Sequence, residues 1–172
     1  MIPEGVTLSL DGMVLRAKGP LGELTQDLSH MPVQMEVIED SLIVRATSTR
    51  KRNVATVGTA AAHVKNMVKG VTSGYTYKLQ VVYSHFPMTA KVEADKHRIL
   101  IENFGGEKTP RYARIEEGVK VTIHGDDIHV KGINLQAVSQ SAANVENATK
   151  TKKKDLRVFL DGIYLLERSL GM

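Results

Sequence analysis

The chain contains no cysteine. Disulfide bonds, thiolate metal sites and a cysteine nucleophile are therefore excluded, which fits a reducing cytosol. No apolar run approaches the roughly 18 consecutive residues that a membrane-spanning helix needs, and the first residues lack a charged segment followed by an apolar stretch. The GxSxG, HExxH and GxxxxGK(S/T) motifs are missing as well. The sequence therefore predicts a soluble cytoplasmic protein with no membrane partner.

What the sequence does contain is an internal duplication. Residues Val33–Arg45 and Val119–Lys131 share a strand–turn–strand pattern at a constant offset of 86, and Val57–Val64 aligns with Val138–Val145 at an offset of 81. The first copy thus carries five extra residues, which fall in the segment 46–53. Two modules of roughly 80–90 residues are expected, each of them too small to bury more than about 60–65% of its unfolded surface. A duplicated small module is typical of a binding scaffold.

Alternating apolar residues predict several antiparallel strands. In copy one, Asp11-Gly12 joins a first hairpin and Glu39-Asp40-Ser41 joins a second, with a chain break at Gly19–Gly22 between them. Tyr75–Tyr83 is an alternating strand that bridges the copies. A last apolar tail follows the lysines as a strand and consists of Leu156–Leu160 and Ile163–Leu166, around the turn at Asp161-Gly162. The strands expected in copy two are Lys91–Ala94, Arg98–Glu102, Lys120–Ile123 and Ile128–Lys131.

One helix is expected after the second hairpin of each copy. In copy one it is capped near Ser48 or Thr49, and its apolar stripe consists of Val54, Val57, Ala61, Val64, Val68 and Val71. In copy two it is capped by Asn134, and its stripe consists of Leu135, Val138, Ala142 and Val145. We therefore predict an α+β fold in which residues 1–80 and 81–172 each form a small antiparallel sheet with one helix on its face.

Positive charge gathers in the second copy. The chain has a net charge of +4, and the window Lys150–Arg157 alone has the same net charge. Its cations are Lys150, Lys152, Lys153, Lys154 and Arg157, against the single carboxylate of Asp155. A solvated helix end with a flexible tail would also explain the lysines. An ordered cationic cluster beside a sheet favours phosphate contact, and nucleic acid is the commonest polyanionic partner.

The loop Asn103–Arg114 is a second candidate for phosphate contact. Gly105 and Gly106 permit close approach of the backbone to a ligand, and three cations follow within seven residues, at Lys108, Arg111 and Arg114. Arginine forks match phosphate oxygens and stack on bases. The loop lacks the spacing of a nucleotide-binding loop, so an ordinary exposed hairpin loop is favoured over a nucleotide pocket. Surface contact with RNA requires less of the loop than such a pocket, and its residue types are suited to that contact.

Two further groups of side chains are candidates for anion binding or for catalysis. Arg50, Lys51 and Arg52 stand at a helix start, where cations oppose the helix dipole; they indicate either an external anion or an ordinary solvated face. His124 and His129 flank Asp126-Asp127, a combination that could hold a metal or act as acid and base. The first copy has Glu39-Asp40 at the same turn and no histidine. We therefore expect the acidic residues to belong to the turn of each hairpin, and the two histidines to lie on an exposed strand face.

Three segments resemble one protein family. They are Asn103–Arg114, the tail Asp155–Tyr164 (DLRVFLDGIY) and the early Gly-Pro-Leu-Gly at 19–22. Together they are similar to the universal large-subunit ribosomal protein L-six, in its archaeal and eukaryotic branch. The resemblance extends over essentially the whole chain, including the duplication.

The resemblance implies a non-enzymatic structural constituent of the large ribosomal subunit, with no cofactor and no metal. Such a protein binds large-subunit ribosomal RNA near the factor-binding centre, at the stalk base and close to the sarcin–ricin loop, beside neighbouring ribosomal proteins and passing translation factors. It places most RNA contacts in the second module and lets the first face outward. The RNA-contact residues implied are Gly105, Gly106, Lys108, Arg111, Arg114, Lys150, Lys152, Lys153, Lys154 and Arg157, and Arg50, Lys51 and Arg52 are secondary candidates for RNA or factor contact.

Two other functions remain open from the sequence. A protein–protein adaptor would recruit partners by strand addition at exposed sheet edges. A metal-dependent hydrolase would use the cluster of His124, Asp126, Asp127 and His129. Neither explains why the second copy has two basic clusters.

Overall fold

The protein is described here from a computed structural model, which covers residues 3, 5–38, 41–152, 154–155 and 157–172. The chain divides into two compact units, Met1–Gly74 (unit 1) and Tyr75–Met172 (unit 2). The boundary that we expected after residue 80 lies inside the first strand of unit 2. In the described part of the chain, neither helix has the length and apolarity that crossing a bilayer requires.

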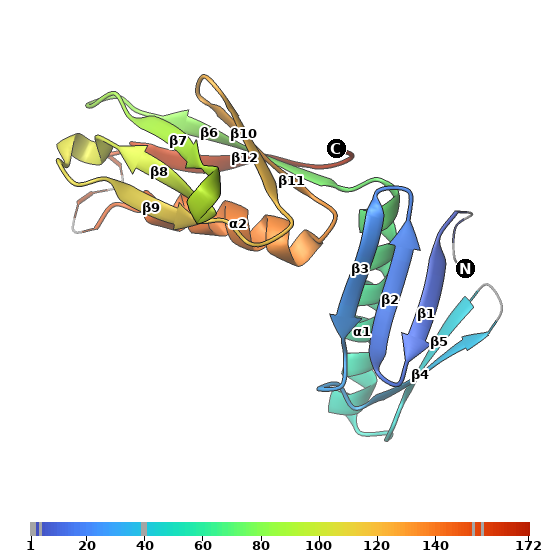
Figure 1. Ribbon diagram of the computed structural model, residues 1–172. Coiled ribbons are helices and arrows are strands. Elements are labelled where there is room, and N and C mark those ends of the chain that lie inside the picture. The colour runs from blue at the N-terminus through green and yellow to red at the C-terminus, as the bar shows by residue number, and fades with distance from the viewer. Residues whose placement is uncertain (1–2, 4, 39–40, 153, 156) are drawn as a thin grey trace. The chain divides into compact units, whose positions relative to one another are not determined.

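Unit 1 is built from two small antiparallel sheets and one helix (Figure 1). Its elements are β1 (Thr7–Asp11), β2 (Val14–Gly19), β3 (Gly22–Asp27), β4 (Val33–Ile38), β5 (Ser41–Ala46) and α1 (Lys51–Thr72). Strands β1, β2 and β3 form one sheet, and β4 pairs with β5 in the other. Both expected hairpins are present, although the turn residues 39 and 40 of the second lie outside the described residues.

Strand β3 was not expected from the sequence. The Gly-Pro-Leu-Gly segment is a tight turn that pairs Gly19 with Gly22, so the chain reverses there and continues as a strand. This turn packs on the end of α1, where the Leu21 N–H donates to the Val71 carbonyl at 3.0 Å. A Cβ atom added to Gly19 would come within 2.7 Å of the same carbonyl oxygen. The small residue is therefore required by the contact with the helix.

Helix α1 begins later than expected from the sequence, and a different face of it is buried. Its N-cap is Arg50, which makes no side-chain capping bond, and no acidic residue occupies the first turn. The buried face contains Val64 and Val71 of the predicted stripe, whereas Val54 is 53% exposed. Ala60 and Met67 take part in the core instead. The buried side chains face β1 and β2, where Leu8, Leu15 and Ala17 complete the core of unit 1.

Unit 2 has the same plan with two additional strands (Figure 1). Its elements are β6 (Tyr75–Val82), β7 (Thr89–Glu93), a 3₁₀ turn (Ala94–Lys96), β8 (Arg98–Glu102), a 3₁₀ turn (Phe104–Gly106), β9 (Arg111–Arg114), β10 (Lys120–His124), β11 (Asp127–Gly132), α2 (Leu135–Ala148) and β12 (Gly162–Leu170). Strands β7, β8 and β9 form a three-stranded sheet, and the other sheet has the order β10-β11-β6-β12.

The core of unit 2 lies between these sheets and α2. Strand β6 alternates as expected, with Tyr75, Tyr77, Leu79 and Val81 buried. The predicted cap of α2 is confirmed, because the Asn134 side chain accepts the Gln136 N–H at 2.9 Å. The expected stripe faces inward, and the fully or nearly fully buried helix residues are Val138, Ser141, Ala142 and Val145.

The α+β class is confirmed. Each unit has a three-stranded sheet, a hairpin and one helix, so the duplication is visible in the fold, but each unit contains two sheets instead of one. Unit 2 is larger because two more strands, β6 and β12, extend its hairpin into a four-stranded sheet. Strand β6 pairs with β11 on one side and with β12 on the other. Among the described residues, no further strand pairs with the β4–β5 hairpin of unit 1.

Candidate RNA interface

The loop that follows β8 has an irregular backbone. Asn103, Gly105 and Gly106 all adopt positive φ angles, of 58°, 57° and 80°. The Phe104 side chain between them is buried and anchors the loop in the core. A Cβ atom on Gly105 would meet nothing within 4 Å, whereas one on Gly106 would lie 3.3 Å from the Phe86 ring. The backbone at Gly105 is therefore open to an approaching ligand, and Gly106 is a packing position.

Arg111 is the most heavily bonded cation of the loop. Its Nε and Nη2 atoms donate to the two carboxylate oxygens of Glu107 at 2.8 and 2.6 Å. Its Nη1 atom donates to the carbonyl oxygens of Ala148 and Lys150 at 2.9 and 3.3 Å. The guanidinium also lies over the Phe104 ring, 4.2 Å from the centroid. Arg111 thus joins the loop to the end of α2, and four of its five N–H groups donate within the protein.

The same contacts hold Glu107 in its charged form. The hydrogen bond from Arg111 is the largest influence and lowers the pKa of the Glu107 carboxyl, although burial opposes it. The positive charges of Arg111 and Lys154 lower the pKa further. Arg111 therefore balances the negative charge of Glu107 within the loop.

The lysine-rich segment after α2 is ordered by short-range contacts. The Arg157 N–H donates to the Asp155 side chain at 2.9 Å, and the Lys154 ammonium lies 4.7 Å from the centre of the Phe159 ring. An apolar strand was expected over Leu156–Leu160, but the described residues 157–160 form a turn and a loop, in which Val158 and Leu160 are more than half exposed. Leu156 and Lys153 themselves lie outside the described residues.

The loop and the lysine-rich segment lie side by side. A hollow of about 280 Å³ is bounded on one side by loop residues and on the other by Thr151, Lys152, Lys154 and Phe159. A second hollow, of about 420 Å³, lies against Arg111 and Tyr112 and is bordered by Lys150 and Lys152. We call the residues around these two hollows the loop–tail surface, namely Phe104, Gly105, Glu107, Arg111, Tyr112, Asn147, Ala148, Lys150, Thr151, Lys152, Lys154, Phe159 and Asp161.

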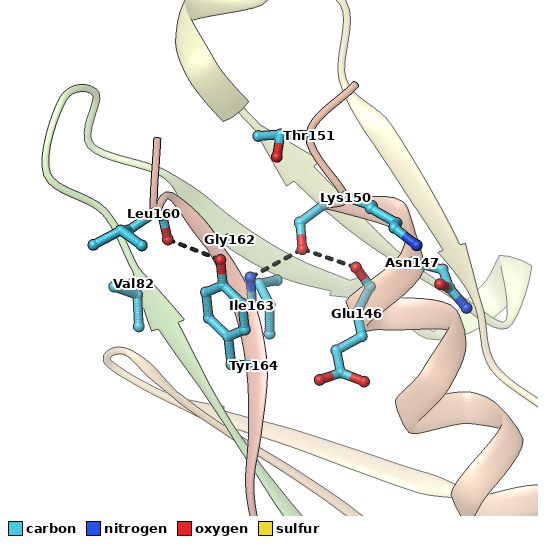
Figure 2. Close-up of a pocket in the computed structure, with 10 residues that line it drawn as sticks. Val82, Glu146, Asn147, Lys150, Thr151, Leu160, Gly162, Ile163 and Tyr164 are labelled. Atoms are coloured by element: carbon cyan, nitrogen blue, oxygen red, sulfur yellow. Dashed lines mark hydrogen bonds between the residues drawn. The ribbon is translucent and has the colours of Figure 1, made fainter. Parts of the chain in front are cut away.

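A third hollow extends this surface beyond Lys150 (Figure 2). It measures about 640 Å³ and lies between the end of α2 and the start of β12. Its walls are fixed by hydrogen bonds: the Ile163 N–H donates to the Thr149 hydroxyl at 2.9 Å, and the Tyr164 hydroxyl donates to the Leu160 carbonyl at 3.0 Å. The segment that carries the lysines is therefore tied to the sheet at its far end.

The remaining candidates fall into two groups. Lys108 and Arg114 are exposed near the loop–tail surface, and the Arg114 Nε atom lies 3.9 Å from Oε1 of Glu116. Arg50, Lys51 and Arg52 belong to unit 1, at the exposed start of α1, and are not part of the loop–tail surface. Sequence reasoning missed Asn147 and Thr151, which are uncharged and belong to no motif.

Aromatic side chains accompany the cations. Tyr112 is 50% exposed on β9, and the Arg98 guanidinium lies 4.1 Å from the centre of its ring. Phe159 lies in a loop and not in a strand, with the His85 ring on it at a centroid distance of 5.1 Å.

Two groups that resemble catalytic sites have structural roles. His124 and His129 lie edge to face on neighbouring strands at a centroid distance of 6.1 Å, while Asp127 pairs with Lys78 at 2.8 Å. Within the described residues, no three histidine or carboxylate side chains are arranged to hold a metal ion. In the second group, Ser84 and Asp161 both approach the same Nδ1 atom of His85, at 3.0 and 3.4 Å. A catalytic triad needs them on opposite ring nitrogens.

Asp161 instead fixes the start of β12 to the end of β6. Its Oδ1 atom accepts the Ser84 N–H at 2.7 Å and the Ser84 hydroxyl at 2.9 Å. Burial alone would raise the pKa of the Asp161 carboxyl, but the hydrogen bonds from Ser84 and His85 outweigh it and hold the pKa below its usual value. Its charge therefore stabilises unit 2.

Replacing Asp161 by asparagine is expected to reduce the acid sensitivity of unit 2. Because the folded pKa is lowered, the stabilisation is complete above the unfolded pKa of about 3.9 and is lost as pH falls through the folded value. The variant should be less stable than the parent by roughly 1–3 kcal/mol at pH 7, and the difference should shrink by pH 2. Urea unfolding followed by tyrosine fluorescence measures both. The exposed carboxylate of Asp126 supplies the control: if Asp126→Asn behaves in the same way, the bonds of Asp161 are not responsible.

Comparison with known proteins agrees with this architecture. The Ribosomal protein L6 family matches residues 2–74 and 86–162, which are most of unit 1 and most of unit 2. The chain belongs to the ribosomal protein L6 family. The expected family is thereby confirmed, and the two matched segments follow the two units.

Individual relatives within the L6 family cover nearly the whole chain. Large ribosomal subunit protein uL6 of Aeropyrum pernix is 49% identical over 170 residues, which are 98% of this chain and 92% of that protein. The proteins of the same name from Staphylothermus marinus and Methanothrix thermoacetophila are 47% and 42% identical, over 96% and 97% of this chain. The expected resemblance was to the archaeal and eukaryotic branch, and these relatives are archaeal. The non-enzymatic character expected for this chain is confirmed as well.

Proposed function

We propose that this chain binds large-subunit ribosomal RNA through the loop–tail surface of unit 2. As an L6 family member it is a structural protein of the large subunit of the cytoplasmic ribosome and has no catalytic role of its own. The proposal concerns which residues meet the RNA and how. The observation that carries it is the meeting of the glycine loop with the lysine-rich segment, two segments some 40 residues apart that border the same hollow of about 280 Å³.

The charges of the surface support contact with phosphates. Lys150, Lys152 and Lys154 are all exposed, and Lys108 extends the row from the loop. Each lysine that meets a phosphate releases a condensed counterion, which favours association and makes it sensitive to salt. Gly105 lets the RNA backbone approach the loop closely, because no side chain stands in the way.

For Arg111 we propose a different role from the one that its residue type suggested. We propose that it positions the surface, since its donors already bind Glu107 and the end of α2. The direct contacts are assigned to Gly105, Lys108, Arg114, Lys150, Lys152, Lys154 and Arg157, and Gly106 supports the loop. Lys153 stays a proposed contact, although it lies outside the described residues.

Recognition should depend on RNA shape and backbone more than on base sequence. Lysines act as point charges and read no base edges, whereas the two partly exposed rings of Tyr112 and Phe159 offer stacking to any base. The position near the factor-binding centre and the stalk base is the one that the family resemblance implies. Arg50, Lys51 and Arg52 remain proposed as a separate contact of unit 1 with RNA or a passing factor.

A salt titration tests the surface directly. Changing Lys108, Lys150, Lys152 and Lys154 together to glutamine should flatten the slope of log K against log salt by roughly 3 units for large-subunit ribosomal RNA. Affinity at low salt should fall strongly, and tyrosine fluorescence should show that unit 2 is still folded. Filter binding at four or more salt concentrations gives the slope.

The matched control removes four exposed cations from other surfaces, at Arg16, Lys18, Arg45 and Lys120. This variant has the same net charge as the first and should change the slope by less than about 1 unit. Equal slopes for the two variants would mean that net charge, and not the loop–tail surface, determines binding.

A further inference from the structure

Unit 1 has an apolar groove beside the open edge of its hairpin. The groove has a volume of about 550 Å³ and lies between β1, β5 and α1. The only charged residues that line it, among those the structure describes, are Lys65 and Lys69. The lining residues are Pro3, Leu8, Leu42, Val44, Ala61, Val64, Lys65, Val68 and Lys69.

The duplication shows what occupies the equivalent place in unit 2. At the offset of 86, β5 corresponds to β11. Strand β11 has a neighbour on each side, β10 on one edge and β6 on the other. Within the described residues, β5 pairs with β4 alone. The edge that β6 covers in unit 2 is thus left without a strand by the part of unit 1 that the structure describes.

Burial of the matching side chains shows the same difference. Ile128 and Val130 of β11 are completely buried, each with 0% of its surface exposed, because β6 lies beside them. Their counterparts Leu42 and Val44 are only partly buried and line the groove. Two apolar side chains of unit 1 therefore have room for further contacts.

Helix α1, which lines the groove, shows the same difference from its counterpart in unit 2. At the offset of 81, Lys65 and Val68 of α1 correspond to Glu146 and Thr149 of α2. In unit 2, Glu146 and Thr149 accept backbone N–H groups of β12, from Leu165 at 3.1 Å and Ile163 at 2.9 Å. This face of the helix binds strand β12 in unit 2, whereas the equivalent face of α1 lines the groove in unit 1.

We propose that the groove binds an extended segment of a partner protein, which adds to β5 as an antiparallel strand in the way that β6 adds to β11. An unpaired strand edge offers a row of backbone donors and acceptors to such a segment. Alternate side chains of the segment point into the groove, and most of them are apolar, to cover Leu42 and Val44. Lys65 and Lys69 line the same groove, so their ammonium groups select an acidic residue among the side chains that point inward.

A pair of short peptides tests this proposal with the full chain. One is a fluorescein-labelled heptapeptide amide, Val-Thr-Val-Thr-Val-Thr-Glu, whose valines and glutamate share one face of a strand, and the other has lysine in place of the glutamate. The glutamate peptide should bind at least tenfold more tightly, as measured by fluorescence anisotropy. Hydrogen exchange should show that binding protects the amides of Ser41–Ala46. Failure of the glutamate peptide to bind at millimolar concentration, or binding that leaves these amides unprotected, overturns the proposal.

Charge reversal separates the groove from other basic surfaces. Changing Lys65 and Lys69 to glutamate should invert the preference, so that the lysine peptide binds more tightly. The matched control, Arg16→Glu with Lys18→Glu, changes the same net charge on β2 and should preserve the original preference. An unchanged preference in the first variant contradicts the assignment of the two lysines. Light scattering that shows a dimer, with β5 protected in the dimer and no peptide binding, would mean that a second copy is the occupant and would overturn the proposal.

Discussion

Arg111→Ala is expected to lower the free energy of unfolding of unit 2 by about 3 kcal/mol, the largest loss expected for any cation of the loop–tail surface. The substitution removes the two-pronged bond to Glu107, the bonds to two carbonyl groups at the end of α2, and the contact with Phe104. It also leaves Glu107 without its main partner. For a unit of about 100 residues the melting temperature should fall by roughly 12 °C or more.

The measurement is thermal or urea unfolding followed by tyrosine fluorescence. All five tyrosines lie at position 75 or later, so this signal reports on unit 2 alone. Lys108→Ala in the same exposed loop is the matched control and should change the unfolding free energy by less than about 0.5 kcal/mol. If Arg111 were mainly a phosphate contact, Arg111→Ala would leave unfolding unchanged and reduce only the salt slope of RNA binding, by roughly 0.9.

Arg111→Lys adds a second comparison. It preserves the positive charge but replaces the planar fork by a single ammonium group. We expect it to recover less than half of the stability lost in the alanine variant, because an ammonium cannot reach the Glu107 carboxylate and the carbonyl of Ala148 with the same geometry. Full recovery would show that charge alone is sufficient at this position.

Gly19→Ala is expected to destabilise unit 1 by about 2–3 kcal/mol. The added methyl group would stand 2.7 Å from both the carbonyl oxygen and the Cγ2 atom of Val71, closer than a Cβ atom can approach. The turn must move away from α1, which breaks the hydrogen bond between Leu21 and Val71. The backbone of Gly19 itself is in an ordinary conformation, so the effect comes from the contact alone.

Far-UV circular dichroism combined with tyrosine fluorescence distinguishes the two units in this variant. The transition seen by dichroism should broaden or split as unit 1 melts earlier, while the tyrosine signal of unit 2 should stay in place. Gly58→Ala is the control within the same unit, because its added Cβ atom meets nothing within 4 Å on the exposed side of α1. It should stabilise unit 1 by up to about 1 kcal/mol. A neutral Gly19→Ala would show that the turn does not rest on the helix as described.

The regular elements were largely predictable because they follow from periodicity. The hairpin at Asp11-Gly12, the alternation of β6 and the cap at Asn134 are local properties of the chain, and all three are confirmed. Strand β3 was missed since its only strongly apolar residue is Leu24, and a strand with one such residue has no visible alternation. The stretch before β12 was wrongly expected as a strand, because Val158 and Leu160 are apolar but exposed.

The roles of single side chains were less predictable. Arg111 was expected to contact RNA on the strength of its type and its loop, but its partners Ala148 and Lys150 are about 40 residues away in the chain. The orientation of α1 was similarly ambiguous. Val54 and Ala60 are both apolar, and only the packing of the helix against β1 and β2 shows that Ala60 is the one in the core.

The order of residues by itself determined the duplication, the α+β class, the family and the two basic segments, because repeats, alternation and charge are written along the chain. Tertiary structure alone decided that these segments border one surface and that Arg111 links them. It also decided that β6 completes the sheet of unit 2, whereas β5 has no second neighbouring strand among the described residues of unit 1. Such features depend on contacts between distant residues, whose distances in space are set by the packing of the whole unit and not by local sequence.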